Sequence, residues 1–93
     1  MIGHATTHSE NEARLSRIEG QIRAVKRMIG DGEYCIDIIT QIQAARSALQ
    51  SVSKIILEKH LRHCVVDALK KQDEADIDSK IDEILKTIKR MEK

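Results

Sequence analysis

The longest regular pattern of hydrophobic positions runs through the middle of the chain, from Glu33 to Lys71. Apolar residues recur there in alternating steps of four and three, at Ile38, Ile42, Ala45, Leu49, Val52 and Ile56. No glycine or proline interrupts the stretch. This spacing is typical of one face of an α-helix, and it continues far beyond the length of an ordinary globular helix. We therefore expect one very long helix over residues 33–71.

A shorter hydrophobic seam precedes this stretch and repeats every three to four residues, at Leu15, Ile18, Ile22, Val25 and Ile29. It predicts a first helix that ends at about Ile29. The residues Ser9–Glu12 match a capping box, in which the serine hydroxyl accepts a hydrogen bond from the glutamate amide. Two glycines around Asp31 then stop the helix, and Asp31 is expected to cap the next one. Because this turn is short, the first two helices should pack antiparallel.

The end of the chain carries a third apolar seam, at Ile77, Ile81, Ile84, Ile88 and Met91. The polar residues 72–75 before it are typical of a connector, and Asp76 or Asp78 is expected to cap the third helix. Residues 1–8 are expected to form a flexible tail. The pattern thus predicts an all-α fold in a single domain over residues 9–93. Its three helices are a short basic first helix, a very long second helix and a short third helix.

The composition indicates one small domain with an aliphatic core, since 41% of the 93 residues are hydrophobic and the only aromatic residue is Tyr34. So short a chain buries proportionally little surface and cannot cover a very long helix by itself. We therefore expect the protein to oligomerise. The N-terminus has no basic start followed by an apolar run, and no stretch is apolar enough to span a membrane. This predicts a cytoplasmic protein with reduced thiols and no membrane partner.

The net charge of +1 does not mark the whole chain as a nucleic-acid-binding protein. The first helix is nevertheless rich in basic residues, with Arg14, Arg17, Arg23, Lys26 and Arg27. A solvated helix face is the simple explanation, but the same face repeated over several subunits could bind phosphates. Further basic residues near the end of the third helix suit a helix C-terminus and could extend that surface. They are Lys86, Lys89, Arg90 and Lys93.

Two cysteines and one histidine of the long helix are the candidate metal ligands. His60 and Cys64 are four residues apart, so they share one helix face. Cys35 precedes His60 by 25 residues, which is ~37 Å along a straight helix, so one chain cannot bring them together. Two antiparallel helices can, and two thiolates with one imidazole suit Cu(I) or Zn(II). The alternative is that both cysteines are small core residues and His60 is a surface histidine.

No catalytic machinery is visible in the sequence. The chain lacks a Gly-rich phosphate loop and a His-Glu-x-x-His motif, and its serines have no evident base beside them. An ordinary helix-turn-helix is not indicated either, because no tight pair of helices provides a recognition helix. We expect a binding protein rather than an enzyme.

Three stretches of the sequence carry a family resemblance. They are RLSRIEGQIR from Arg14, YCIDI from Tyr34 and HLRHCVVDA from His60. They resemble the copper-sensing CsoR/RcnR family of bacterial repressors over nearly the whole chain after Ser9. The resemblance implies a dimer built as an antiparallel four-helix bundle and a flat tetramer of two such dimers. It also implies a repressor that binds operator DNA without metal and releases it on binding Cu(I), which derepresses copper-resistance genes.

The same resemblance assigns the residues of the metal site. It implies one Cu(I) per protomer at the dimer interface, held by Cys35 of one subunit and by His60 and Cys64 of the other. Tyr34 matches a position beside these ligands. The carboxylate that the family places near the third helix has no clear equivalent, and Asp78 or Glu74 is the expected substitute.

The resemblance also implies a DNA-binding surface on the basic faces of the helices. The expected residues are Arg14, Arg17, Arg23 and Arg46, together with Lys86, Lys89 and Arg90. Contacts to phosphates and to duplex shape should dominate there. The expected partners are operator DNA, further copies of the chain and, as a metal donor, a copper chaperone.

Two alternatives remain open. A nickel- or cobalt-responsive repressor of the same family would add an N-terminal histidine, and His4 lies close to that place. His8 and His63 are further candidate ligands. The second alternative is a helical protein that binds metal or handles thiols and has no role on DNA. A Cu(I) sensor is favoured over two other branches of the family. The formaldehyde-responsive branch lacks a cysteine like Cys64, and the persulfide-responsive branch lacks a histidine like His60.

Overall fold

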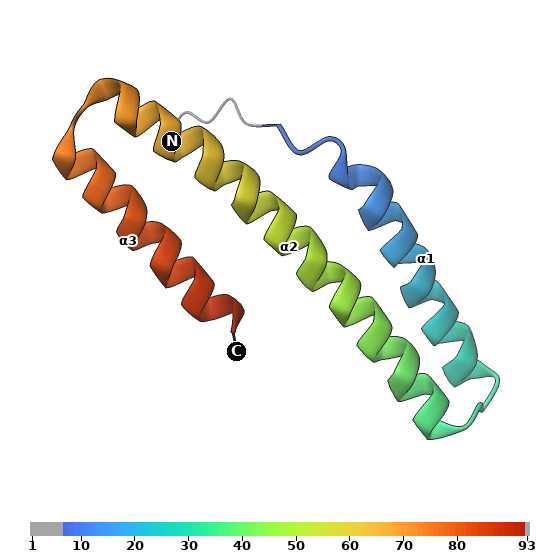
Figure 1. The fold of residues 1–93 in the computed structure, drawn as a ribbon. Coiled ribbons are helices and arrows are strands. Elements are labelled where there is room, and N and C mark those ends of the chain that lie inside the picture. Colours follow the sequence, from blue (N-terminus) through green and yellow to red (C-terminus); the bar gives the residue numbers. More distant parts are fainter. Residues whose placement is uncertain (1–6, 93) are drawn as a thin grey trace. The chain divides into compact units, whose positions relative to one another are not determined.

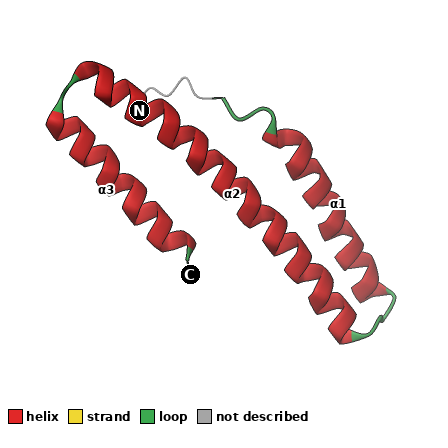
Figure 2. Cartoon of the chain, viewed as in Figure 1, coloured by secondary structure: helices red, strands yellow, loops and turns green. Residues whose placement is uncertain are grey.

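The structure is a computed structural model that describes residues 7–92 of the chain. It contains three α-helices: α1 (Asn11–Gly30), α2 (Cys35–Lys71) and α3 (Glu74–Met91). Figure 2 shows only helices and loops over this part of the chain, which confirms the all-α, three-helix prediction. No helix among the described residues is long and apolar enough to cross a membrane.

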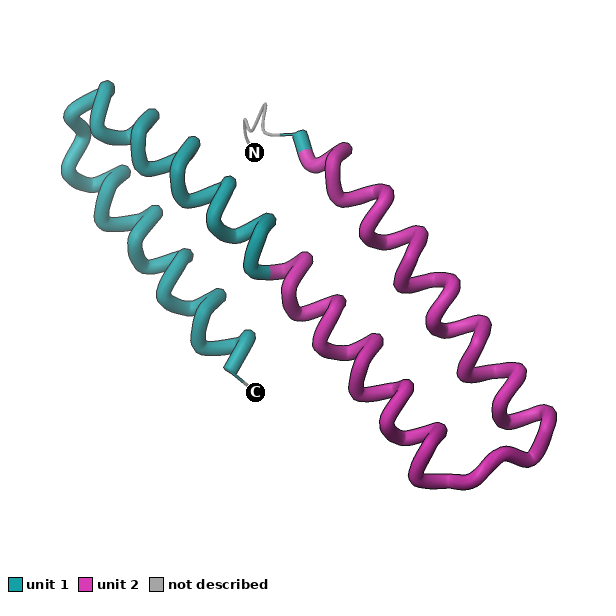
Figure 3. Tube along the Cα trace, turned by 45° about the vertical axis from the view of Figure 1, so that its right-hand side comes forward, with its two compact units in different colours: residues 1–7, 54–93 teal, residues 8–53 magenta. Residues whose placement is uncertain are grey.

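The chain divides into two compact units, coloured separately in Figure 3. The N-terminal unit is His8–Ser53, and it pairs α1 with the first half of α2 as an antiparallel hairpin (Figure 1). The C-terminal unit contains Lys54 and the residues that follow it, together with Thr7. It pairs the second half of α2 with α3, again antiparallel (Figure 1).

The core of the N-terminal unit is narrow and repeats every seven residues. Its buried positions are Asn11, Ile18 and Val25 on α1 and Ala45 and Val52 on α2. A seven-residue repeat is the spacing at which two helices keep the same faces in contact over several turns. The rest of the predicted α1 seam is exposed in a single chain, with Leu15 at 40%, Ile22 at 47% and Ile29 at 60%.

The start of α1 differs from the prediction in its capping, whereas its end confirms the predicted glycine stop. At its start no side chain caps the helix, because Glu10 already has helical backbone angles, and the Glu12 amide donates to the Ser9 carbonyl at 3.1 Å. The predicted capping box is therefore wrong. At its end the amide of Glu33 donates to the Met28 carbonyl at 3.0 Å.

The amide of Gly32 also donates to the Ile29 carbonyl at 3.2 Å, and Gly32 has a φ of +67°. These two bonds and the left-handed glycine form a Schellman motif that terminates α1. Asp31 is the C-cap of α1 rather than a cap of α2. The backbone carbonyl of Tyr34 accepts from the amides of Asp37 and Ile38 at the start of α2.

The turn between α2 and α3 is shorter than the expected connector. Gln72 ends α2 with a φ of +53°, and its amide donates to the carbonyls of Ala68 and Leu69. The side chain of Asp73 then accepts from the Asp76 amide at 3.2 Å. Asp73, not Asp76 or Asp78, is therefore the cap of α3, because its backbone is extended as the N-cap position requires.

Candidate metal centre

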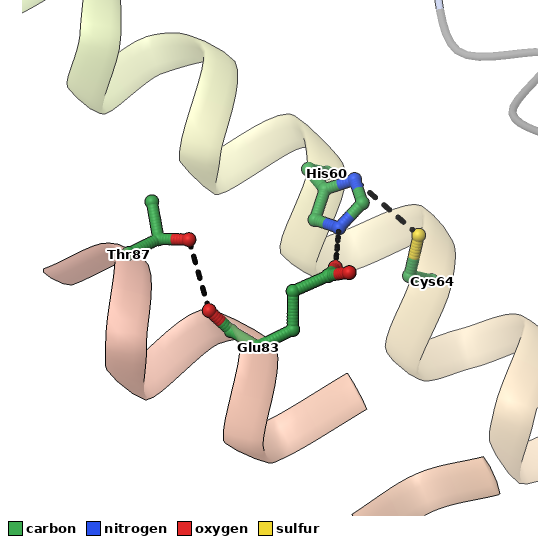
Figure 4. A network of polar contacts seen from close by, with 4 residues as sticks. All are labelled: His60, Cys64, Glu83 and Thr87. Carbon is green, nitrogen blue, oxygen red and sulfur yellow. Dashed lines mark hydrogen bonds and ion pairs between the residues drawn. The ribbon is translucent and has the colours of Figure 1, made fainter. Parts of the chain in front are cut away.

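The candidate ligands on the second half of α2 lie together. His60 and Cys64 are one helical turn apart, and the Cys64 Sγ atom is 3.4 Å from the His60 Nδ1 atom (Figure 4). The helix itself produces this pair, because residues at i and i+4 are neighbours on one face. A soft sulfur and an imidazole nitrogen at this separation provide two adjacent donors that suit copper.

Glu83 of α3 completes the surroundings of His60. Its Oε1 atom is 3.0 Å from the His60 Nε2 atom, on the side of the ring away from Cys64 (Figure 4). A carboxylate accepts the proton of Nε2, which assigns the neutral ring to the tautomer that is unprotonated at Nδ1. Glu83 therefore directs the nitrogen that faces Cys64 to act as an acceptor or a metal ligand.

In the structure Glu83 is a carboxylate in contact with His60, whereas the sequence suggested Asp78 or Glu74. Asp78 and Glu74 lie nearer the turn after α2, and Asp78 is exposed. In an antiparallel hairpin that turns at residues 72 and 73, the α3 residue level with His60 lies about three turns beyond the loop, where Glu83 is found. The signal that could have identified Glu83 was the register set by the Asp73 cap, which the sequence reading placed elsewhere.

Cys64 is buried in the single chain, with 5% of its surface exposed. Burial raises the pKa of its thiol above the ordinary value, because the thiolate loses its hydration. The ammonium group of Lys80 on α3 partly opposes this rise in pKa, while the carboxylates of Glu83, Asp67 and Asp76 add to it. Without metal, the thiol is therefore held in its protonated form.

Cys35 and Tyr34 belong to the N-terminal unit. Cys35 is the first residue of α2 and is exposed, and Tyr34 directly before it is 68% exposed. α2 is unbroken from Cys35 to beyond Cys64, as the length argument requires. Among residues 7–92 of one chain, no group of three or more His, Cys, Asp or Glu side chains could hold a metal ion.

The expected DNA-binding residues are all exposed, and they are distributed over both units. The N-terminal unit carries Arg14, Arg17, Arg23 and Arg46, and α3 carries Lys86, Lys89 and Arg90. Arg14 is held in place, because its Nη1 atom donates to Asn11 Oδ1 at 3.1 Å and to the Glu10 carbonyl at 3.5 Å. Sequence reasoning did not single out Asn11, which is 1% exposed and the buried polar residue of the α1 seam.

The additional histidines are distributed along the chain, and one of them lies outside the described residues. His4 and most of the expected tail over residues 1–8 lie outside residues 7–92. The His8 carbonyl accepts from the Asn11 amide at 2.9 Å, and its Nδ1 atom is buried without a hydrogen-bond partner. The carbonyl of Thr7 accepts a hydrogen bond from the ammonium of Lys59. His63 is exposed on α2.

Comparison with known proteins identifies a family. A family model described as metal-sensitive transcriptional repressor matches residues 7–90. The chain is 51% identical over 65 residues to the copper-sensing transcriptional repressor RicR of Mycobacterium tuberculosis, covering 69% of this chain and 68% of RicR. It is 41% identical over 94 aligned residues to the copper-sensing transcriptional repressor CsoR of Bacillus subtilis, covering 99% of this chain and 90% of that protein.

The fold is also similar to a solved structure, the copper-sensing repressor CsoR with Cu(I) from Geobacillus thermodenitrificans. The TM-score is 0.79 and the sequence identity 41%, and the alignment covers 100% of this chain and 95% of that chain. At this identity and coverage, the likeness extends over all three helices.

Proposed function

Because this chain belongs to the metal-sensitive transcriptional repressor family, we propose that it represses transcription by binding operator DNA and that Cu(I) releases it. The observation that carries the choice of metal is the adjacent pair of donors on α2, the Cys64 thiol and the His60 imidazole. The copper-sensing descriptions of RicR and CsoR support the same choice. The genes released from repression by Cu(I) would then be those of copper resistance. The protein would act in the cytoplasm.

The proposed site takes its third ligand from a second subunit. Cys35 lies at the far end of an unbroken helix from His60 and Cys64, so an antiparallel copy of α2 is needed to bring a second thiol to the pair. Two thiolates and one imidazole offer Cu(I) a three-coordinate site, with one Cu(I) for each protomer. Glu83 holds the His60 ring in the required tautomer, and Tyr34 accompanies Cys35 at the start of α2.

The proposed assembly is a dimer that pairs into a tetramer. Large apolar side chains remain exposed on α2 of the single chain, including Ile36, Ile39, Ile42, Leu49, Leu61, Val66 and Leu69. So many large apolar side chains exposed on one helix are typical of a surface that a partner covers. An antiparallel four-helix bundle of two hairpins would cover the N-terminal part of this surface.

The proposed DNA surface consists of Arg14, Arg17 and Arg23 of α1, Arg46 of α2 and the basic end of α3. Guanidinium groups bind phosphate oxygens strongly and in a defined geometry. Cu(I) would act by tying α2 of one subunit to α2 of another, which favours an arrangement in which these surfaces no longer fit the duplex. Such a coupling is typically about 1–3 kcal/mol.

The test is DNA release measured against three metals. Fluorescence anisotropy with a labelled duplex from the region upstream of the protein's own gene should show binding by the metal-free protein. Cu(I) should release the duplex at about one equivalent per protomer, the stoichiometry that a site shared by two chains predicts. Release by Ni(II) or Co(II) instead would favour the nickel or cobalt alternative. Absence of binding at low salt would favour a metal- or thiol-binding protein without a role on DNA.

A further inference from the structure

Gly20 lies in the interior of α1, where glycine is unfavourable. In a helix interior, glycine destabilises relative to alanine because it loses more backbone freedom on folding. A Cβ atom added at Gly20 would meet nothing nearer than the Arg23 Nη2 atom, at 4.0 Å, which is an ordinary contact distance. No contact within the described chain accounts for this glycine, and the open space over it leaves room for a partner to approach the helix closely.

Gly20 lies on the side of α1 opposite to the apolar side chains of the helix. At about 100° per residue, Gly20 lies about 160° around the helix axis from the buried Ile18. The exposed apolar side chains Leu15, Ile22 and Ile29 lie within about 60° of Ile18 on the other side of the helix. A second copy of the chain would cover that apolar flank, so Gly20 faces a different partner.

The surroundings of Gly20 identify the chemistry of this partner. Arg27 lies about 20° from Gly20 around the axis, and Arg17 and Arg23 lie about 60° to either side. All three are exposed, and among residues 7–92 none of them makes an ion pair or a side-chain hydrogen bond. Glu19, about 100° away, is the nearest exposed acid along this turn. A second copy would bring the same positive charges, whereas a phosphate backbone complements them.

We propose that the sugar–phosphate backbone of duplex DNA passes directly over Gly20, with the guanidinium groups of Arg17, Arg23 and Arg27 around it. The missing side chain lets the backbone approach the helix closely enough for arginines on both sides to reach phosphates. This inference rests on the proposed DNA binding, and it adds Gly20 and Arg27 to that surface. Because these contacts are to phosphates, they position the protein on DNA without reading bases.

The test compares substitutions of Gly20 with the same substitution at Gly30. Gly30 also has no atoms within 4 Å of an added Cβ, but it lies at the end of α1. Gly20→Ala should raise the melting temperature and leave the assembled mass and Cu(I) affinity unchanged. It should weaken operator binding about tenfold, the loss of one charge-assisted contact, and Gly20→Leu should weaken it further. Gly30→Ala should bind operator like the unsubstituted protein.

A second comparison tests the arginine that this inference adds. Arg27→Gln should make the dependence of operator affinity on salt shallower by about one counterion. Lys26→Gln, which removes a neighbouring charge about 100° around the helix, should change the slope less.

Three outcomes separate the explanations. If the unsubstituted protein binds operator and both Gly20 variants bind equally well, the inference is overturned and the proposed function stands. If Gly20→Ala changes the assembled mass, a second copy approaches Gly20 and the inference is likewise overturned. If the unsubstituted protein binds no DNA at any salt concentration, the proposed function and the inference both fail.

Discussion

At the scale of single residues, the candidate metal centre is organised by the ring of His60, which lies between a candidate metal ligand and a carboxylate that accepts a proton. One nitrogen faces the Cys64 thiol and the other faces the Glu83 carboxylate. The sequence predicted the first contact, because a spacing of four residues on a helix makes neighbours. It did not predict the second, because a contact between two helices depends on their register, which a displacement of the α3 cap by a few residues changes.

Replacing Glu83 by alanine should weaken Cu(I) binding about 10–100-fold, the usual effect of losing a partner that orients a metal-binding histidine. Operator binding by the metal-free protein should change much less, because Glu83 is not one of the cationic residues of the proposed DNA surface. A competition titration with a Cu(I) chelator measures the first quantity. Asp78→Ala is the matched control, and a loss of Cu(I) affinity as large as that of Glu83→Ala would contradict the assignment.

The pKa of Cys64 predicts a pH dependence of folding. An unfolded chain ionises this thiol at about pH 8.5, while burial keeps it protonated to higher pH in the folded chain. Since the folded pKa is the raised one, this stabilising contribution is complete below about pH 8.5 and is lost as the pH rises toward the folded pKa. Urea unfolding of the metal-free, reduced protein should therefore show a lower midpoint at pH 9.5 than at pH 7.5.

Cysteine substitutions provide the controls for this pH dependence. Cys64→Ala should flatten the change between the two pH values, whereas Cys35→Ala should retain it, because Cys35 is exposed. An equal pH dependence in the two variants would show that other groups cause it.

Asn11 fixes the side chain of Arg14 but leaves one of its own buried polar atoms without a hydrogen bond. Its Oδ1 atom accepts from Arg14, but its Nδ2 atom is buried without a hydrogen-bond partner. An unsatisfied buried amide costs about 1–3 kcal/mol, so Asn11→Leu should raise the free energy of unfolding by about 1–2 kcal/mol. Denaturant unfolding measures this, with the exposed Ala13→Leu as a control that should change it by less than about 0.5 kcal/mol. A destabilised Asn11→Leu protein would indicate a partner for Nδ2.

At the scale of elements, the hydrophobic seams predicted all three helices and the glycines predicted the end of α1, whereas the caps at the helix starts were predicted wrongly. The body of a helix follows from many repeated positions, so a single residue changes the prediction little. An end depends on the backbone angles of one or two residues, which are set by how the hairpin closes. Gly32 and Gln72, the two residues with positive φ in the described part of the chain, terminate α1 and α2. A glutamine gave no sequence signal for such a position, whereas the glycine did.

The cap of α3 can be tested directly. Asp73→Ala should lower the free energy of unfolding by about 1 kcal/mol, because the Asp76 amide loses its acceptor at the exposed start of the helix. Asp78→Ala should change it by less than about 0.5 kcal/mol, as expected for a surface residue without a capping contact. Thermal unfolding of the two variants under the same conditions distinguishes them. A larger loss for Asp78→Ala would support the cap that the sequence suggested.

At the scale of the whole molecule, the sequence predicted that one chain would be insufficient, and the exposed apolar side chains of the hairpins agree with that expectation. Leu15, Ile22 and Ile29 continue the α1 seam but are not covered by α2. The spacing of a seam predicts which residues face a neighbouring helix, but it does not tell whether that helix belongs to the same chain. For the same reason the sequence could place Cys35 away from His60, while the identity of the subunit that joins them stays a prediction.

Mixing two inactive variants tests whether the site is shared. Cys35→Ala and Cys64→Ala homodimers each lack one ligand of every site, so neither should bind Cu(I) tightly. In a mixed dimer, the intact Cys35 of one chain meets the intact His60 and Cys64 of the other, which restores one of the two sites. After co-refolding in equal amounts, about one quarter of the unsubstituted number of tight sites should return, because about half of the dimers are mixed. Tight Cu(I) binding by either variant alone would contradict a site formed by Cys35 of one chain and by His60 and Cys64 of another. So would the absence of tight binding in the mixture.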